Sequence, residues 1–300
     1  MKSIFTGFLI LAVVIVGMSC GKKADSTLSV QSFIGDVKVV SPKGDHAPAP
    51  GETLAENDAV TTGPSSLVDI MYGSSGIIRI NENSSVTLSK LFSGEKNGET
   101  RINMDRGKMF VSLSKLSRDS SFEIKTTTSV AAVRGTAFRV LADSTSSQID
   151  VITGKIAVSP VKDGQVVPDI QTEVESSKSV VVDQKAVEEA VEKQAAPEAV
   201  AITSTAMKEI HEEVKNIAPA KDLNQSTQKE ITDVLAKISV EKDRTDGKEL
   251  ETATPVVHAK VRHKQAEALT IQQKAAKEQE VQQKKTEETK ERRVKNIPTL

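Results

Sequence analysis

The sequence is poor in cysteine and in aromatic side chains. It holds one cysteine, one tyrosine, seven phenylalanines and no tryptophan, and no aromatic residue follows Phe138. A single cysteine, Cys20, excludes an intramolecular disulfide and a thiolate metal cluster. The glycines are also confined, since Gly247 alone lies beyond Gly164. Core-building and turn-building residues are therefore concentrated in the first half of the chain, which predicts one well-packed domain there.

Patterns that carry catalytic chemistry are missing as well. The sequence has no Gly-x-Ser-x-Gly, no His-Glu-x-x-His, no phosphate loop and no dinucleotide fingerprint. His258 and His263 are five residues apart, which does not align them on one face of a helix as a zinc site would need. The net charge of −1 gives no reason to expect nucleic-acid binding, which basic proteins favour. We therefore expect no enzymatic activity, no cofactor, no metal and no nucleic-acid partner.

What the N-terminus does contain is a targeting pattern. Residues 1–19 have the form of a signal peptide, with Lys2 before an apolar run over residues 4–16. The run ends in small residues before Cys20, a pattern that resembles the lipobox of bacterial lipoproteins. We expect Cys20 to carry the lipid, including palmitate, with residues 20–29 as a tether. An ordinary signal peptide with an incidental cysteine and an uncleaved signal anchor remain alternatives.

This pattern also predicts the cellular location of the protein. The protein is expected to be exported and lipid-anchored to a bacterial membrane. Gly21 stands where some bacteria place the aspartate that retains lipoproteins at the inner membrane, so the outer membrane or its periplasmic face is slightly favoured.

Residues 30–161 alternate between apolar and polar side chains with a period of two. Short runs rich in β-branched residues are separated by Gly, Pro, Ser and Asp turn signals. This is typical of a mainly β domain, an antiparallel sandwich, a roll or a solenoid. The sequence leaves open which of these forms it takes.

One interruption within this pattern is informative. The stretch VAAVRGTAFRV, residues 130–140, is apolar except for Arg134, Gly135 and Thr136. Gly135 permits a backbone conformation or a close approach that a Cβ would forbid, and a Thr136 hydroxyl can bond local backbone groups. We interpret the three residues as a tight corner, with Phe138 buried beyond it and Arg134 bonded to several carbonyls. The alternative is that Arg134 is a receptor for an anion or carboxylate; no second cation is expected beside it, since Arg139 should point elsewhere.

The order of these features resembles the FecR domain, named after the ferric-dicitrate sensor. The resemblance rests on the corner run and on a turn before a strand, a Gly-Ser-x-Ile-x-Ile-type strand and a Gly-x-Met-Phe strand: Ala132-Val133-Arg134-Gly135-Thr136-Ala137-Phe138, Thr62-Gly63-Pro64-Ser65-Ser66, Ser75-Gly76-Ile77-Ile78-Arg79-Ile80 and Gly107-Lys108-Met109-Phe110. It implies a FecR-like β fold in the periplasm. Family members that act as sensors join this domain to a membrane span and a cytoplasmic segment that holds a sigma factor.

The second half of the chain has a different character. Residues 162–204 are acidic overall and are expected to form a linker. Within it, Val180–Val182 could add a last strand, and Ala186–Ala196 is helix-prone up to Pro197. Residues 205–240 contain two short stretches with apolar residues on one helical stripe, so two short amphipathic helices are expected there, the first capped by Ser204. Residues 241–300 are charged and low in complexity, which predicts a tail that is a solvated helix or disordered, with a coiled coil or a partner-binding helix as the alternative.

Three functions are compatible with these observations. The first is a non-enzymatic, lipid-anchored envelope protein whose FecR-like domain binds or acts as a scaffold, its tail contacting another envelope protein, an anionic cell-wall polymer or a lipid surface. The second is a periplasmic component of cell-surface signalling that regulates a sigma factor indirectly, because a lipid anchor cannot carry a conformational change across a bilayer. The third, a hydrolase or metal enzyme, is disfavoured by the missing motifs.

Overall fold

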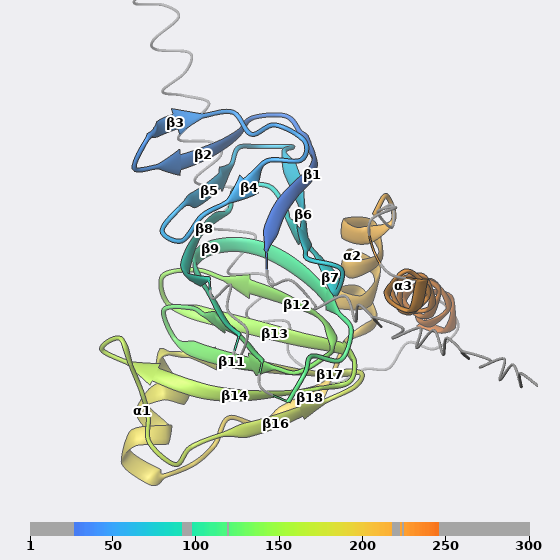
Figure 1. The fold of residues 1–300 in the computed structure, drawn as a ribbon. Helices are drawn as coiled ribbons and strands as arrows, with labels where there is room; N and C mark the ends of the chain where they lie inside the picture. The colour runs from blue at the N-terminus through green and yellow to red at the C-terminus, as the bar shows by residue number, and fades with distance from the viewer. Residues whose placement is uncertain (1–26, 92–97, 119, 218–222, 224, 246–300) are drawn as a thin grey trace, which may run out of the picture.

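The computed structural model describes residues 27–91, 98–118, 120–217, 223 and 225–245. Over these residues the chain forms two stacked β-sheets that share one long strand, with helices at their margins (Figure 1). The expectation of a mainly β fold is therefore confirmed.

The first sheet, called sheet A, lies beneath the helices α2 and α3. Its strands follow one another in this order: β4 (Thr53–Leu54), β1 (Leu28–Ile34), β6 (Leu67–Tyr72), β7 (Gly76–Ile80), the second half of β9 (Glu99–Leu113), β12 (Ala137–Ala142), β13 (Ser146–Thr153), β17 (Lys178–Asp183) and β18 (Ala199–Ala201). Neighbouring strands in this sheet run antiparallel, as short turns between sequential strands allow.

The second sheet, called sheet B, packs against the inner face of sheet A. Its strands follow in this order: β3 (Gly44–His46), β2 (Val37–Ser41), β5 (Ala59–Thr62), β8 (Ser85–Leu91), the first half of β9, β10 (Ser121–Lys125), β11 (Ser129–Val133), β14 (Lys155–Lys162) and β16 (Thr172–Glu175). The strand β10 runs parallel to β9, and β15 (Gln165–Val166) adds a hairpin to β14.

The strand β9 passes from one sheet to the other. Its first half pairs with β8 and β10, and its second half pairs with β7 and β12. The change occurs at Gly107, whose φ is +110°. A Cβ at this position would lie 2.5 Å from the Cα of Ser84. Only glycine fits this bend, so one residue type fixes where the two sheets are joined.

The main core lies between the sheets. Inward positions are aliphatic, as the alternating pattern predicts, and few aromatic rings are needed to fill the space. The rings of Tyr72 and Phe122 meet edge to face with centroids 5.4 Å apart, and the Tyr72 hydroxyl lies 3.1 Å from the Thr100 Oγ1. The polar end of a buried tyrosine is thus satisfied within the core.

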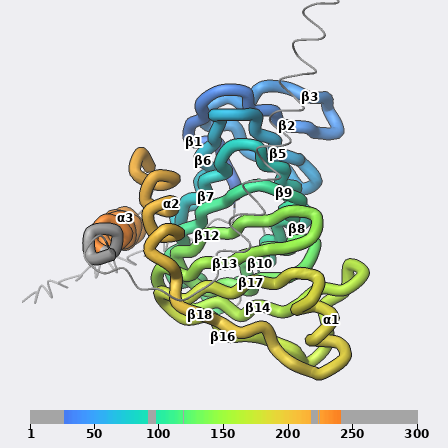
Figure 2. Tube along the Cα trace, turned by 180° about the vertical axis from the view of Figure 1, so that it is seen from behind, coloured from blue at the N-terminus to red at the C-terminus, as the bar shows by residue number. Residues whose placement is uncertain are grey.

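A second core forms on the outer face of sheet A. The helices α2 (Ser204–Val214) and α3 (Gln225–Thr245) pack side by side over it, as both views show (Figures 1 and 2). The helix α2 places Met207, Ile210 and Val214 on one stripe. These side chains bury the outward apolar residues of the sheet, among them Met71, Ile77, Phe110, Ala137 and Ile152.

The structure corrects the expected boundary at residue 161. Strands β16 and β17, the helix α1 (Gln184–Lys193) and strand β18 occupy the segment expected to be a linker. Val174, Val180 and Val182 are buried in the main core, whereas Glu173 and Glu175 point outward. These two glutamates lie on the solvent face of β16, so the acidic character of this part does not indicate a linker.

The two helices expected at residues 205–240 are present as α2 and α3. The helix α2 is capped by Thr203, not by Ser204, because Thr203 has the extended backbone of a cap and its side chain accepts the Ala206 amide. The signal peptide at 1–19, Cys20 and most of the tail at 241–300 lie outside the described residues.

Candidate functional site

The corner at residues 134–136 connects sheet B to sheet A, between β11 and β12. Gly135 has a φ of +117°, and a Cβ there would lie 2.6 Å from the Cα of Lys115. The Thr136 Oγ1 donates to the Lys155 carbonyl at 3.2 Å, so it bonds the neighbouring strand β14 and not the local backbone that the sequence suggested. Val133 and Phe138 are buried on either side. Gly135 and Thr136 are thus architectural.

Arg134 has a different role from its two neighbours. It is exposed, and its Nη2 donates to the carbonyl of Arg118 at 2.6 Å. No other hydrogen bond joins its guanidinium to the described part of the chain. The sequence led us to expect that Arg134 would satisfy several carbonyls. It bonds one, which leaves most of its five donors facing solvent.

The predicted turn at residues 62–66 is held by its own polar side chains. The Thr62 Oγ1 donates to the Asn81 carbonyl at 2.6 Å, and the Ser66 Oγ accepts the Asp36 amide at 2.8 Å. Gly63 donates its amide to the Asp36 carbonyl, and Ser65 takes a positive φ of 53°. These hydrogen bonds tie the turn to the segment after β7 and to the β1–β2 turn, so we assign it a structural part.

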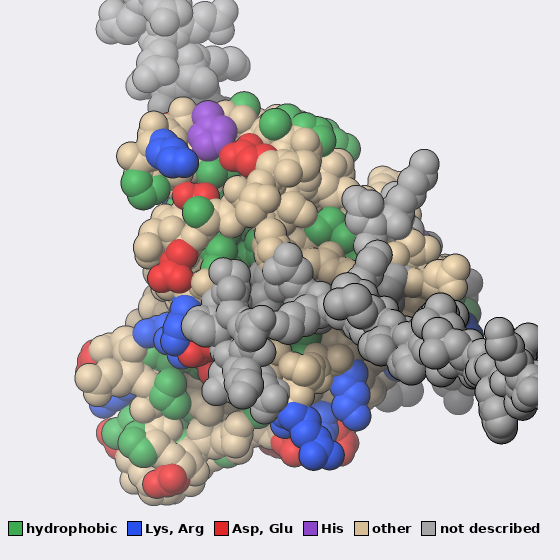
Figure 3. Space-filling model, in the orientation of Figure 1, with side chains coloured by type: hydrophobic (Ala, Val, Ile, Leu, Met, Phe, Trp, Pro, Cys, Tyr) green, Lys and Arg blue, Asp and Glu red, His purple; other side chains and the backbone are tan. Residues whose placement is uncertain are grey.

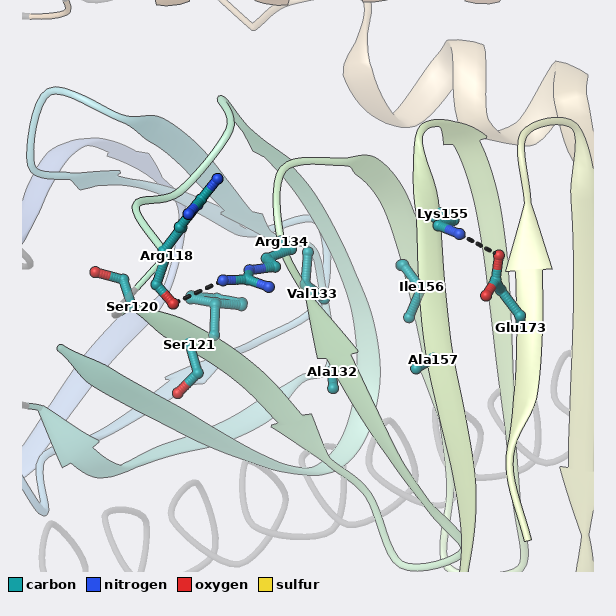
Figure 4. Close-up of a pocket in the computed structure, with 11 residues that line it drawn as sticks. Arg118, Ser120, Ser121, Ala132, Val133, Arg134, Lys155, Ile156, Ala157 and Glu173 are labelled. Carbon is teal, nitrogen blue, oxygen red and sulfur yellow. Dashed lines mark hydrogen bonds and ion pairs between the residues drawn. The ribbon is translucent and has the colours of Figure 1, made fainter. Parts of the chain in front are cut away.

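A pocket of about 600 Å³ opens at the corner (Figure 4). We call it the Arg134 groove and define it by Arg118, Ala132, Arg134, Lys155, Ala157 and Glu173. Figure 4 shows Arg134 reaching toward the Arg118 backbone, with Lys155 and Glu173 joined on the opposite side.

The groove corrects the expectation that Arg134 has no second cation nearby. Arg118 and Lys155 line the same pocket, although they are 16 and 21 positions away in the sequence. Lys155 donates to Glu173, and this hydrogen bond together with the charge of Glu173 raises the pKa of Lys155. In the space-filling view, basic side chains gather beside acidic ones near the ends of β14 and β16 (Figure 3). This group of cations could not be predicted from the sequence pattern, because its members come from three separate segments.

A second polar cluster lies on the outer face of sheet A. Cross-strand pairing places Asp69, Arg79, Phe110, Arg139 and Asp150 in one continuous row over β6, β7, β9, β12 and β13. We call this the arginine row. Arg79 binds Asp69 through two hydrogen bonds of 2.7 Å, and Arg139 binds Asp150 at 2.6 and 2.9 Å. All four charged side chains are buried.

The helix α2 lies over the arginine row and completes it. The Arg79 Nη1 donates to the Glu213 carbonyl at 3.1 Å. The Glu213 carboxylate lies 3.4 Å from the Arg139 Nη1 and 3.6 Å from the Lys108 Nζ. Burial alone would lower the pKa of Arg139, but Asp150 and Glu213 outweigh it and raise that pKa. The row is therefore an ionic attachment for α2, and the buried charges are compensated.

The described residues offer no cluster of three or more His, Cys, Asp or Glu side chains that could hold a metal. No described helix combines the length and the apolar character needed to cross a membrane. The predicted lipidation site, Cys20, is not among the described residues.

Comparisons with known proteins assign one segment of the chain to a family. Residues 58–157 match the family model described as FecR protein, which includes the corner and the arginine row. No curated protein matches the sequence. Two solved structures of a "putative anti-sigma factor" from Parabacteroides distasonis are similar to the chain, each with 14% identity and a TM-score of 0.38.

These two matches cover 51% of this chain and 63% and 62% of the solved chains, so this chain spans less than two thirds of their length. The family match, by contrast, falls on the strands whose motifs carried the resemblance in the sequence. The chain therefore carries a FecR domain at residues 58–157.

Proposed function

We propose that this protein is a component of bacterial cell-surface signalling that regulates a sigma factor indirectly, through another membrane protein. The observation that carries the proposal is the FecR domain at residues 58–157. The FecR family is regulatory and non-enzymatic, and its members are associated with the cell envelope. This supports signalling over the lipid-anchored scaffold that the sequence first favoured.

The proposed arrangement has the protein outside the cytoplasm, held by a lipid on Cys20. An acyl chain anchors a protein to one leaflet only, so the signal must pass to a partner that spans the membrane. The scaffold function remains the second candidate, since a β-sandwich held by a lipid also suits a binding module. The charged tail at 241–300 would then contact an envelope protein, a wall polymer or a lipid surface.

Photo-crosslinking in intact cells tests the proposal. A crosslinking amino acid at Glu123, on the outward face of β10 within the FecR domain, is compared with one at Lys43, in the β2–β3 turn outside the matched segment. We expect Glu123 to capture a membrane-spanning signalling protein and Lys43 to capture none. Capture of peptidoglycan or structural envelope proteins alone would support the scaffold function and overturn the proposal.

The lipid anchor is tested separately. We expect radiolabelled palmitate to be incorporated into the wild-type protein and lost in Cys20→Ala. Labelling that persists in Cys20→Ala, or a wild-type protein that is never labelled, would contradict lipidation at this residue.

A further inference from the structure

We propose that the Arg134 groove binds a small organic acid, with a carboxylate at the Arg134 guanidinium and an apolar stem over Ala132 and Ala157. This ligand would be the signal that the proposed pathway detects. Its role as a signal rests on the proposed function, but its binding to the groove does not. Binding itself is measured directly, so the two can fail separately.

The corner does not need the Arg134 side chain. Gly135 provides the positive φ, and Thr136 provides the bond to β14. Arg134 is left exposed with one bond to the Arg118 carbonyl. A planar guanidinium with free donors matches the geometry of a carboxylate, which it binds through two parallel hydrogen bonds.

The floor of the groove is formed by two small apolar side chains. Ala132 on β11 lies directly opposite Ala157 on β14, and both side chains point outward from sheet B. The same cross-strand row continues to Glu123 on β10 and Glu173 on β16. Two methyl groups between longer side chains leave a depression with an apolar base. Its volume of about 600 Å³ lies within the range of pockets that hold small molecules, roughly 300–1,000 Å³.

The charged side chains that line the groove are mostly basic. Arg118, Arg134 and Lys155 line the groove together with one acid, Glu173, which Lys155 already binds. Two guanidinium groups are left without an ionic partner among the described residues. An anion is therefore attracted to the groove. An organic carboxylate, unlike inorganic phosphate, also carries an apolar stem that can cover the floor.

The test uses the full chain purified in detergent and follows ligand binding by NMR. The probes are hexanoate and adipate, with hexanamide as the uncharged match and inorganic phosphate as a plain anion. We expect both acids to bind and the amide not to bind. Arg134→Gln is expected to weaken binding about tenfold or more, since it removes a charged hydrogen-bond donor. Ala132→Leu, which fills the floor, should also weaken binding.

The matched control is Arg106→Gln, an exposed arginine on β9 outside the groove. We expect it to leave binding unchanged, with melting temperatures of all three variants close to the wild type. The proposal is overturned if no acid binds, if phosphate binds as well as the acids, or if Arg106→Gln weakens binding as much as Arg134→Gln does. Loss of acid binding with intact signalling would remove this inference alone, and acid binding without any signalling would remove the proposed function.

Discussion

Arg79 and Arg139 flank Phe110 in a single cross-strand row of sheet A, and each holds a buried aspartate on its far side. The row is nearly symmetrical about Phe110, with Asp69 at one end and Asp150 at the other. The helix α2 covers it and bonds both arginines. The FecR domain thus presents a charged face that a later part of the same chain covers.

Loss of Arg139 is expected to destabilise the protein strongly. Arg139→Met leaves the Asp150 carboxylate, which is fully buried, with only the Gln148 amide as a hydrogen-bond donor among the side chains described. Removing one partner of a buried pair costs about 3–5 kcal/mol of unfolding free energy. Denaturant unfolding measures this cost. The double variant Arg139→Met with Asp150→Leu should recover much of it, and a double variant as unstable as the single one would contradict the account.

The packing of α2 provides a second prediction. Ile210 is fully buried at the centre of the second core. Ile210→Ala is expected to lower the free energy of unfolding by about 2–5 kcal/mol because it leaves a cavity. Ile34→Ala serves as the control, since that side chain is 61% exposed, and its effect should stay within about 0.5 kcal/mol. Equal effects of the two variants would show that α2 is not part of the cooperative fold.

The corner glycine can be tested against a glycine of the same conformation. Gly135 and Gly44 have φ values of +117° and +118°, but only Gly135 has backbone in the path of a Cβ. Both alanine variants bear the cost of a positive φ, about 1–2 kcal/mol. Gly135→Ala should cost about 1–3 kcal/mol more because of the clash with Lys115. Thermal unfolding of the two variants compares them, and equal losses would argue against a tight corner.

The pair His46 and Glu52 predicts a local pH dependence. The Glu52 hydrogen bond, at 2.6 Å, raises the pKa of His46 above its ordinary 6.5. Burial acts to raise the pKa of Glu52, but bonds from His46 and the Ala49 amide outweigh it, so this pKa falls below 4.5. The His46 contribution to stability is complete below pH 6.5 and is lost as the pH rises through its raised pKa. The Glu52 contribution is complete above pH 4.5 and is lost as the pH falls.

The pair therefore contributes most between the two ordinary values, and NMR titration of the His46 ring measures the shift. In Glu52→Gln the pKa of His46 should return toward 6.5. The variant Glu56→Gln, which removes a carboxylate that makes no bond to His46, should leave it raised. A His46 pKa that is the same in both variants would contradict the assigned cause.

The alternation of apolar residues predicted most of the strands up to β14. The pattern is clearest in strands such as β10, which have one face in the core and the other toward solvent. It failed over part of residues 162–204. Val180–Val182 indicated a last strand, which is β17, but β16 carries glutamates on its solvent face and the acidic composition hid the buried Val174. Composition averaged over a segment does not separate the two faces of a strand.

The candidate site was predicted only in part. The corner was recognised from Gly135 and its neighbours, since a glycine between two apolar runs indicates a special backbone. The groove was not, because Arg118, Arg134 and Lys155 meet only through the pairing of β11 with β14 and the loop before β10. The arginine row was also missed, since charged residues inside a strand pattern are ordinarily read as solvent-exposed.

The most direct test of the account is the transcription of sigma-factor-dependent genes in a strain that lacks this protein. We expect the transcription of one sigma regulon to change on deletion and to be restored by the wild-type gene. Arg106→Gln should restore it fully, and Cys20→Ala should not. An unchanged set of transcripts in the deletion strain, with defects confined to the integrity of the envelope, would contradict the signalling function.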